Sequence, residues 1–537
     1  MEFLKNRFIN LIMLICLVHG IHGQTTFNDF DITWSDGMRL SRQDGHIVDI
    51  FGTDDKGFYT LSTWDNNSLG SIFGGGRNAP VFTVDYFSNN LKKINTKKID
   101  FADMSEKRTF ESLFQMKDNR FYLFSSYLNS ERENVLEARL MKPKTLELSS
   151  NQKELHRLSY QGYRKSNSGS YGFKMSRDSS KLLVYYNLPY EKNASEKFGF
   201  KVYDQFLKSI WEKEITLPYT DELFNLVQIR LDDKGDLYVI GKVFRDKLKN
   251  RSQGRPNYDY VVIAYRNNGT EKEEYEIALA DKFVTDVQIT VDENGNIICA
   301  GFYSELGYGG IRGTFYATVD AGTRTMTKGS FKEFDVGFIV EGERNSASKQ
   351  KQVERGKETL TNYFLDELIR KADGGAILIA EQFYERIINS TNTNGTFTRS
   401  YVKYFFNDLI IVSIDSKGDI EWAKKIDKNQ ETINDNGFYS SYYVGVNGDQ
   451  LFVLFNDHEK NLDETRKNIR TFTGRGGIAN LVAVNSSGNL NQYPILYQSI
   501  GEPMIRPVVT RQVGDELIIV SIYRKDQRIG KINLNKK

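Results

Sequence analysis

The sequence predicts an all-β fold in which units of four strands close into a ring, a single β-propeller of seven or eight blades. Three observations predict it. First, a unit made of a polar turn and a short apolar strand recurs along the chain. Second, its strands are apolar on consecutive positions. Third, the sequences of the two chain ends are typical of different strands of one unit. Aromatic residues make up 13% of the chain and only 8 residues are proline, which favours strands over a disordered stalk.

The repeated unit is clearest at 231–241 and 291–301, which align without a gap. In both copies a polar turn, containing Gly235 or Gly295, leads into an apolar strand, as expected for a tight turn between two strands. Looser copies begin at Asp54, Asp118, Asp178, Asp373, Asn447 and Gly514. Eight such markers predict eight blades, and a duplicated marker would leave seven.

The strands of the repeat carry apolar residues on consecutive positions, as at 182–185 and 377–380. Both faces of such a strand must be covered, and blades that stack face to face cover them. A parallel β-helix also repeats, but its coils are shorter than these units. An array of β-sandwiches is the remaining alternative.

The chain ends indicate how the ring closes. The last unit stops after the strand at 528–534, and the segment 27–34 resembles the outer strands that end in Trp211 and Trp422. We therefore expect residues near 27–40 to complete the last blade. Closure of this kind removes the free sheet edges that favour aggregation.

The first residues read as a signal peptide. Lys5 and Arg7 precede an apolar run over 8–18, and small residues follow before position 24. The run is shorter than the roughly 20 residues that a membrane-spanning helix needs. We expect 1–23 to be a signal peptide, 24–537 to be the propeller domain, and the protein to be secreted or to lie in the periplasm or cell envelope.

The charge balance and the cysteine content limit the kinds of partner and the location that we expect for this protein. Lys and Arg number 72 against 70 Asp and Glu, so no overall field attracts nucleic acid or an anionic membrane. Only Cys299 follows the signal segment, so no intramolecular disulfide forms, which favours a bacterial envelope or exterior. We expect a monomer without a membrane span, without nucleic acid, and with an envelope protein or an anionic glycan as partner.

The segment 408–426 combines an apolar strand, a turn at Gly418 and a strand carrying Trp422. It resembles the repeats of seven-bladed propeller proteins and the tryptophan-bearing blades of quinoprotein-like propellers. The whole chain, including 373–382, is similar to exported propeller-like proteins of Bacteroidota. The resemblance implies the fold and not an activity, because the matching positions belong to the blade scaffold and no quinone-site residue carries over.

The residue pattern argues against several kinds of catalyst. His46, His156 and His458 are widely separated, which argues against a histidine-rich metal site, and no Walker loop, nucleophile elbow or zincin motif is present. We expect no metal, no cofactor and no catalysis. The alternative is a glycosidase or lyase acting on polysaccharide through a carboxylate pair in the central pocket, whose residues the sequence does not identify.

One carboxylate stands out among the candidate binding residues. Glu381 falls where the aligned blades have Gly241 and Gly301, at the end of a buried strand, and a charge there needs a partner. Either it bonds its neighbours just beyond the core, or it belongs to a pocket with Gln382 and Asp373.

Arginines recur beside glycines in loops that join the second and third strands of several blades. They are Arg77, Arg255, Arg312, Arg399 and Arg475. Equivalent loops emerge on one face of a propeller, where five guanidinium groups would rim one opening and bind carboxylate, sulfate or phosphate. The other reading is that they are solvated or paired with local acids. We expect a non-catalytic exported binding or scaffold propeller.

The longest segment outside the repeat spans 325–362 and contains a polar run at 345–355. Such a run has too few apolar residues to form part of a core. We expect an exposed insertion, helical or disordered.

Overall fold

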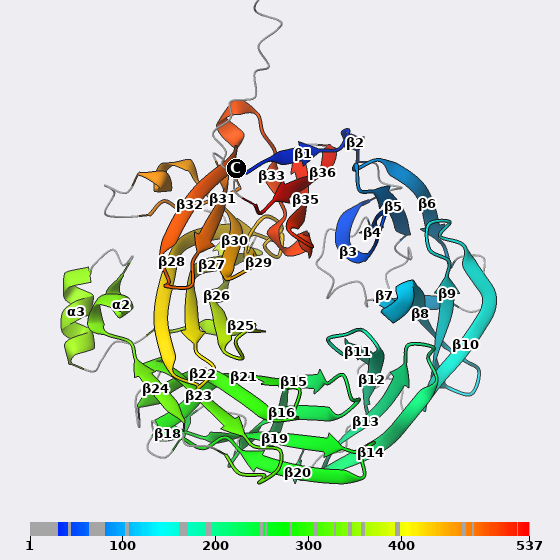
Figure 1. Cartoon of the computed structure of the whole chain (residues 1–537), viewed down its shortest axis with the longest axis horizontal. Coiled ribbons are helices and arrows are strands. Elements are labelled where there is room, and N and C mark those ends of the chain that lie inside the picture. The colour runs from blue at the N-terminus through cyan, green and yellow to red at the C-terminus, as the bar shows by residue number, and fades with distance from the viewer. Residues whose placement is uncertain are drawn as a thin grey trace, which may run out of the picture.

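The computed structural model describes the chain from residue 30 to residue 535, with internal gaps. These are 41–44, 64–80, 102–106, 160–169, 189–194, 221, 247–250, 253–254, 280–281, 306–309, 327–328, 342–345, 356–359, 392–397, 464–468, 475–476 and 524. Figure 1 shows strands arranged in blades around a central axis. None of the helices in the described ranges is long and apolar enough to cross a membrane.

Each of the first four blades is an antiparallel sheet whose strands follow one another from the inside of the ring outward. They are β3(His46–Asp54), β4(Gly57–Thr63), β5(Phe82–Ser88) and β6(Lys93–Ile99); β7(Arg108–Met116), β8(Arg120–Leu128), β9(Glu133–Met141) and β10(Leu148–Ser159); β11(Tyr171–Met175), β12(Lys181–Asn187), β13(Ser195–Asp204) and β14(Ser209–Thr220); and β15(Phe224–Leu231), β16(Leu237–Phe244), β19(Tyr258–Arg266) and β20(Glu271–Glu276). A small ribbon of β17(Arg251–Ser252) and β18(Arg255–Pro256) extends from the fourth blade.

The next three blades follow the same order. They are β21(Lys282–Val291), β22(Ile297–Glu305), β23(Gly313–Val319) and β24(Ser330–Glu333); β25(Tyr363–Arg370), β26(Ala376–Thr391), β27(Thr398–Ile414) and β28(Ile420–Ile433); and β29(Tyr442–Asn447), β30(Gln450–His458), β31(Gly477–Val484) and β32(Leu490–Tyr497). The sixth blade has the longest strands, because β26 and β27 continue beyond the inner strand β25 as a projecting hairpin.

The eighth blade is built from both ends of the chain. Its C-terminal strands are β33(Met504–Ile505), β34(Arg511–Val513), β35(Glu516–Tyr523) and β36(Asp526–Asn533), and β1(Ile32–Trp34) and β2(Met38–Arg39) pair with β36. Ile32 lies opposite Ile532 and Trp34 opposite Gly530. Figure 1 shows blue β1 beside red β36. The predicted closure is therefore confirmed, and the described residues form eight blades.

The apolar core is divided among the interfaces between blades. The buried hydrophobic residues form eight clusters, and each cluster joins two neighbouring blades. Strand β27 shows why its sequence is apolar on consecutive positions: Ile410 and Val412 pack toward the fifth blade, whereas Leu409 and Ile411 pack toward the seventh. Stacked blades therefore cover both faces, as the sequence predicts. Cys299 is fully buried in one of these clusters.

The eight sequence markers all fall at the turn between the inner and second strands of a blade. In the turn at 232–236 the Asp232 Oδ1 accepts the backbone N–H groups of Lys234 and Asp236 at 2.9 and 2.8 Å, and Gly235 has φ +96. Because neighbouring strands are antiparallel, these turns share one end of the ring, here called the tight-turn face. The loops between second and third strands lie at the opposite end, the loop face.

The segment 325–362 is only partly the exposed insertion that the sequence predicts. It begins within the fifth blade, because β24 is that blade's outer strand. The short helices α2(Val336–Val340) and α3(Ser346–Glu354) follow, and Figure 1 shows them outside the ring. Buried apolar residues, spaced along a segment that is polar overall, pack this part against the fifth and sixth blades: Phe334, Ile339, Val353 and Leu360.

Closure of the ring predicts the effect of Phe30→Ala. Phe30 is 2% exposed and its ring meets Phe452 and Tyr493 of the seventh blade at 5.8 and 5.1 Å between centroids. We expect a loss of about 3–5 kcal/mol in the free energy of unfolding, measured by chemical denaturation. The control Phe364→Ala, at a side chain that is 52% exposed, should cost about 0.5 kcal/mol or less. Equal losses would contradict a closing role for the N-terminal segment.

Candidate functional site

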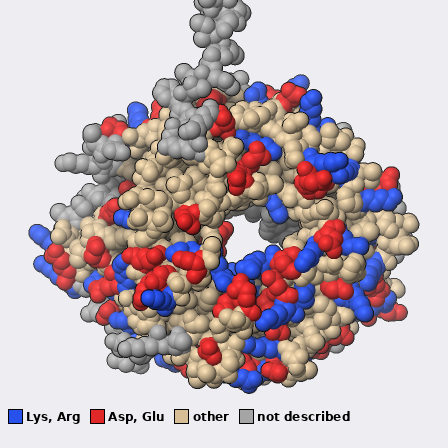
Figure 2. Space-filling model, viewed as in Figure 1, with Lys and Arg blue, Asp and Glu red and all other residues tan. Residues whose placement is uncertain are grey.

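The central channel is lined by the inner strands of the blades. Unlike the second and third strands, they carry exposed residues among buried ones: in β15 the buried Ile229 and Leu231 flank the exposed Arg230, and in β25 the buried Leu365 precedes the exposed Asp366 and Glu367 at a shift in pairing register. One face of each inner strand packs on the core while the other faces the channel. Figure 2 shows an opening at the centre of the ring with both basic and acidic side chains on its rim.

A cleft of about 550 Å³ opens where the channel meets the tight-turn face. Four blades contribute to it. The third supplies Lys174 and Arg177, the fourth Arg230 and Lys234, the fifth Glu293 and the sixth Arg370. We call this cleft the tight-turn mouth.

The acidic groups of the tight-turn mouth are already engaged. The Asp232 carboxylate accepts backbone N–H groups within its own turn, and Asp292 does the same in the next blade. Glu293 accepts two hydrogen bonds from the Arg370 guanidinium at 2.8 and 2.9 Å, and Arg177 lies 3.7 Å away. Asp233 accepts the Asp178 N–H at 3.0 Å and lies 3.9 Å from Arg177, so the acids of the cleft are engaged by groups other than Lys174, Arg230 and Lys234.

Three cations of the tight-turn mouth have no carboxylate within ion-pair distance among the residues that the structure describes: Lys174, Arg230 and Lys234. Burial lowers the pKa of the Lys174 ammonium, and the nearby positive charge of Arg230 lowers it further. Burial also lowers the pKa of Arg230, although the charge of Glu367 opposes this. The acceptors that the Arg230 guanidinium reaches are neutral: the Gln288 Oε1 at 3.4 Å and the Gln228 amide oxygen, in its hydrogen-bonding orientation, at 3.0 Å. An anion would stabilise this pair of like charges.

A second cleft, of about 670 Å³, adjoins the tight-turn mouth and shares Arg177, Glu293 and Arg370 with it. It lies between the sixth and seventh blades. Asp373, a residue that the sequence singled out, lines it beside Lys371, whose Nζ lies 3.3 Å from the Asp373 carboxylate.

Trp422 gives the second cleft an aromatic wall. It is half-buried, and its indole N–H donates to the Ser486 carbonyl at 2.8 Å. A Cβ at Gly488 would lie 2.8 Å from the indole ring, so the ring rests on a position that must be glycine, which also has φ +78. Asn485 and Asp449 complete a lining of polar groups around the ring.

Glu381 lies in a buried network nearer the loop face. Its side chain is 6% exposed, and both carboxylate oxygens have partners: Oε1 accepts from the Lys428 Nζ at 2.6 Å and Oε2 from the Ser441 hydroxyl at 2.8 Å. The Lys428 side chain is fully buried and also donates to the Gln430 Oε1 at 3.2 Å. Gln430 then donates to the backbone of Asn456 in the seventh blade.

Aligned irregularities in three strands explain how these charges enter the interior. The pairing register shifts at Gln382 in β26 and at Asp408 in β27, where β28 shifts as well. A bulge turns side chains away from the regular alternation. Gln382 itself donates to the Thr361 carbonyl at 3.0 Å and accepts from Asn407 at 3.1 Å.

Carboxyls around this network are held toward their neutral form. Burial raises the pKa of Asp366 to about 7, with a further contribution from the charge of Glu381. Asp366 faces the channel, yet protein surrounds its carboxyl on most sides, and the Tyr442 hydroxyl donates to it at 2.9 Å. Burial and then the charge of Asp427 raise the pKa of Asp408 to about 7.

The structure separates the pocket residues suggested by the sequence. Asp373 is in the tight turn before β26, whereas Glu381 and Gln382 lie well along that strand, so Asp373 does not share a site with them. Among the five loop arginines, Arg312 is paired with Glu333 at 2.5 Å. The side chains of the other four lie outside the described residues: Arg77, Arg255, Arg399 and Arg475.

Sequence reasoning missed the cations of the tight-turn mouth. Lys174 and Arg230 come from different blades, and neither belongs to a motif. The alternation in the inner strands, as at 224–231, was a usable signal, because it indicates a solvated face inside the ring.

Comparisons with known proteins find only solved structures of low sequence identity. No family model matches the chain, and no curated protein matches it. Among solved structures, the acylaminoacyl peptidase of Pyrococcus horikoshii is 10% identical, with 91% of this chain and 59% of the peptidase covered and a TM-score of 0.33. The chain thus spans about three fifths of that enzyme's length.

Two further structures show the range of similar proteins. The WD40 domain of SCAP from fission yeast is 7% identical, with 94% of each chain covered and a TM-score of 0.39. An endo-arabinase from Bacteroides thetaiotaomicron is 13% identical, with 56% of this chain and 95% of that one covered and a TM-score of 0.22. The order of strands in the sheets, and not these scores, establishes the eight-bladed propeller.

The buried pair Lys428 and Glu381 predicts a large stability effect. Glu381→Gln should lower the free energy of unfolding by about 3–5 kcal/mol in chemical denaturation, because it leaves the buried Lys428 ammonium without a counter-charge. The double variant Glu381→Leu, Lys428→Met should be less destabilised, since neither charge remains buried alone.

Lys142→Gln is the matched control for this pair. Lys142 pairs with Glu147 at 3.0 Å, but both side chains are about two-thirds exposed, so its loss should cost about 1 kcal/mol or less. A Glu381→Gln variant no less stable than Lys142→Gln would show that the buried pair does not stabilise the fold.

Proposed function

We propose that this protein is a non-catalytic binding propeller whose ligand site is the tight-turn mouth together with the adjoining cleft, and that its ligand is an anionic oligosaccharide. The observation that carries the proposal is the pair Lys174 and Arg230. These two cations come from neighbouring blades, face the same cleft and have no carboxylate at ion-pair distance among the described residues. A carboxylate or sulfate ester placed between them supplies the missing charge.

The shape and lining of the two clefts favour a sugar chain over a single small anion. Together they extend from the channel to the space between the sixth and seventh blades, and they share Arg177, Glu293 and Arg370. The outer part offers the Trp422 ring, the Asn485 amide and three carboxylates, a mixture of aromatic and hydrogen-bonding groups that suits the apolar faces and hydroxyls of a sugar. The inner part offers the cations.

A glycosidase or lyase mechanism has less support at Glu381. Hydrolysis by a carboxylate pair requires both groups to face the substrate. Glu381 is buried, and internal donors occupy both of its oxygens. Asp366 faces the channel, but Glu381, the carboxylate near it, already accepts hydrogen bonds from Lys428 and Ser441. Binding therefore explains the geometry better than catalysis.

The proposed ligand agrees with export, which rests on the sequence. Residues 1–23 lie outside the described residues and have the composition of a signal peptide. We propose a secreted or envelope-located monomer of the kind that the resemblance to exported propellers of Bacteroidota implies. N-terminal sequencing of the protein recovered from its host's exterior or periplasm should begin near residue 24, and an intact first segment would contradict export by cleavage.

Titration of a sulfated or uronic-acid oligosaccharide tests the site. We expect the double variant Lys174→Gln, Lys234→Gln to bind at least about tenfold more weakly than the wild type in calorimetry, because two cations without carboxylate partners are removed. Added salt should weaken wild-type binding and change that of the variant less.

The matched control is Arg312→Ala, Arg475→Ala, which tests the loop face by the same titration. Arg312 is already paired with Glu333, so this variant should bind as the wild type does. Weaker binding in the loop-face variant and unchanged binding in the tight-turn variant would reject the tight-turn mouth in favour of the loop arginines.

A further inference from the structure

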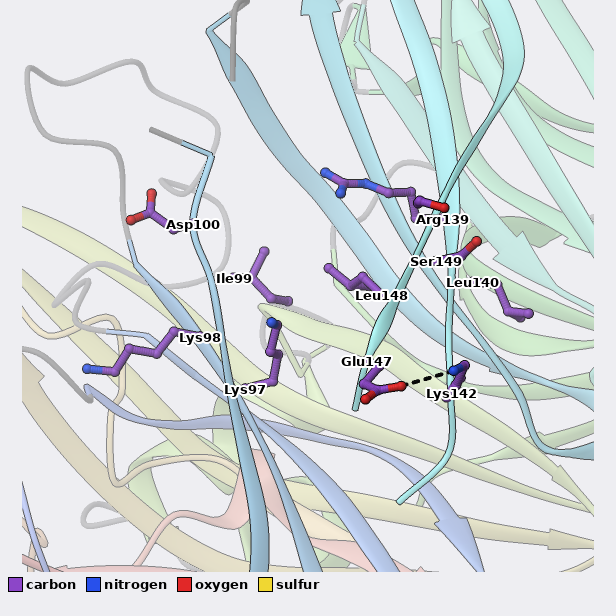
Figure 3. Close-up of a pocket in the computed structure, with 11 residues that line it drawn as sticks. Lys97, Lys98, Ile99, Asp100, Arg139, Leu140, Lys142, Glu147, Leu148 and Ser149 are labelled. Carbon is purple, nitrogen blue, oxygen red and sulfur yellow. Dashed lines mark hydrogen bonds and ion pairs between the residues drawn. The ribbon is translucent and has the colours of Figure 1, made fainter. Parts of the chain in front are cut away.

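A groove separate from the tight-turn mouth runs between the outer strands of the first and second blades. Its volume is about 830 Å³. The outer strand β6 forms one wall, and β9 and β10 form the other. Figure 3 shows Lys97 and Ile99 on the first wall and Arg139, Leu148 and Lys142 across the groove from them.

A bulge in the second blade borders this groove. Leu148 lies opposite Met141, but the next aligned pair is Gln152 and Arg139, so β10 holds three residues where β9 holds one. The extra residues are held by a local hydrogen bond, in which the Asn151 N–H donates to the Ser149 hydroxyl at 3.1 Å. A bulge bends its strand and increases the local twist. The bulged residues Ser149 and Ser150 line this part of the groove.

The groove is basic. Four cations line it, Lys97, Lys98, Arg139 and Lys142, against two acids, Asp100 and Glu147. Glu147 is engaged by Lys142 at 3.0 Å, at one end of the groove (Figure 3). No carboxylate lies within ion-pair distance of Lys97 among the described residues, and its side chain is exposed.

The positive charge extends below the surface. Arg139 lies near Arg108, and burial together with that like charge lowers the pKa of Arg139, although the charge of Glu137 opposes this. Glu137 pairs with Arg108 at 2.6 Å. Two guanidinium groups therefore lie close together beside one carboxylate.

The floor of the groove is aliphatic, which distinguishes it from the tight-turn mouth. Ile99 is 2% exposed, and Leu140 and Leu148 are half-buried beside it. The described lining contains no aromatic ring on which a sugar would stack. Cations spaced along an aliphatic floor match an extended peptide in which acidic and aliphatic side chains alternate, since such a chain presents them on opposite sides.

We propose that this groove between the first and second blades binds an extended acidic segment of a protein partner, with its aliphatic side chains on the half-buried Leu140 and Leu148 and its carboxylates on Lys97, Arg139 and Lys142. The proposal is independent of the ligand at the tight-turn mouth. A scaffold protein needs one surface for its ligand and another for its partner, and the two clefts differ in chemistry in that way.

The probe is a fluorescent synthetic peptide of alternating glutamate and leucine, titrated against the full mature chain. We expect Lys97→Glu, Lys142→Glu to weaken binding by about tenfold or more, because both residues are exposed cations of the groove. The control Lys208→Glu, Lys417→Glu changes the net charge equally at exposed lysines of other blades and should leave binding unchanged. A glutamine and leucine peptide should bind weakly to every form.

Three results would overturn the proposal. Equal weakening by both lysine pairs would show a general charge effect, and equal binding of the glutamine peptide would remove the role of the carboxylates. The third is displacement of the peptide by a sulfated oligosaccharide in the Lys174→Gln, Lys234→Gln variant, which would assign the groove to a glycan. Because that variant lacks Lys174 and Lys234, this experiment tests the groove independently of the proposal for the tight-turn mouth.

Discussion

The pairing of β1 with β36 is the constraint on which the rest of the structure depends. It joins the first described residues to the last strand and completes the eighth blade, which packs against both the seventh and the first blades. Without it the eighth blade would present an open sheet edge, and the cluster that holds Phe30 against the seventh blade would lose a wall. The eight apolar interfaces then form a closed ring, and this ring fixes the positions of the inner strands around the channel.

This arrangement determines where charge and chemistry lie. Second and third strands bury both faces in the interfaces, so polar groups gather on the channel side of the inner strands, in the turns and on the outer strands. The tight-turn mouth combines residues from four blades in this way. The pair of Glu381 and Lys428 is the exception. Bulges in the long strands of the sixth blade place both side chains inside the protein, where a structural role suits them better than ligand binding.

The sequence predicts the fold well because the fold is repetitive. Turn markers, strands apolar on consecutive positions and the tryptophan-bearing outer strands are local patterns, and they predict seven or eight blades and the closing strand, of which the structure shows eight blades and that strand. The site is not local. Lys174 and Arg230 meet only after two blades are stacked. Asp373 and Glu381 are close in sequence but separated in space, because Asp373 lies in the turn before β26 and Glu381 lies well along that strand. Phe334 and Ile339 lie in the segment that the sequence predicts to be exposed, because the segment is mostly polar and contains only a few buried apolar residues.

The most direct measurement of ligand binding at the tight-turn mouth is lysine footprinting by mass spectrometry, with a sulfated oligosaccharide present or absent. Lys174 and Lys234 should be protected from acetylation by the ligand, whereas the exposed Lys208 and Lys417 should react equally in both conditions. Protection spread evenly over surface lysines, or absent from Lys174 and Lys234 while the ligand is bound, would contradict the account.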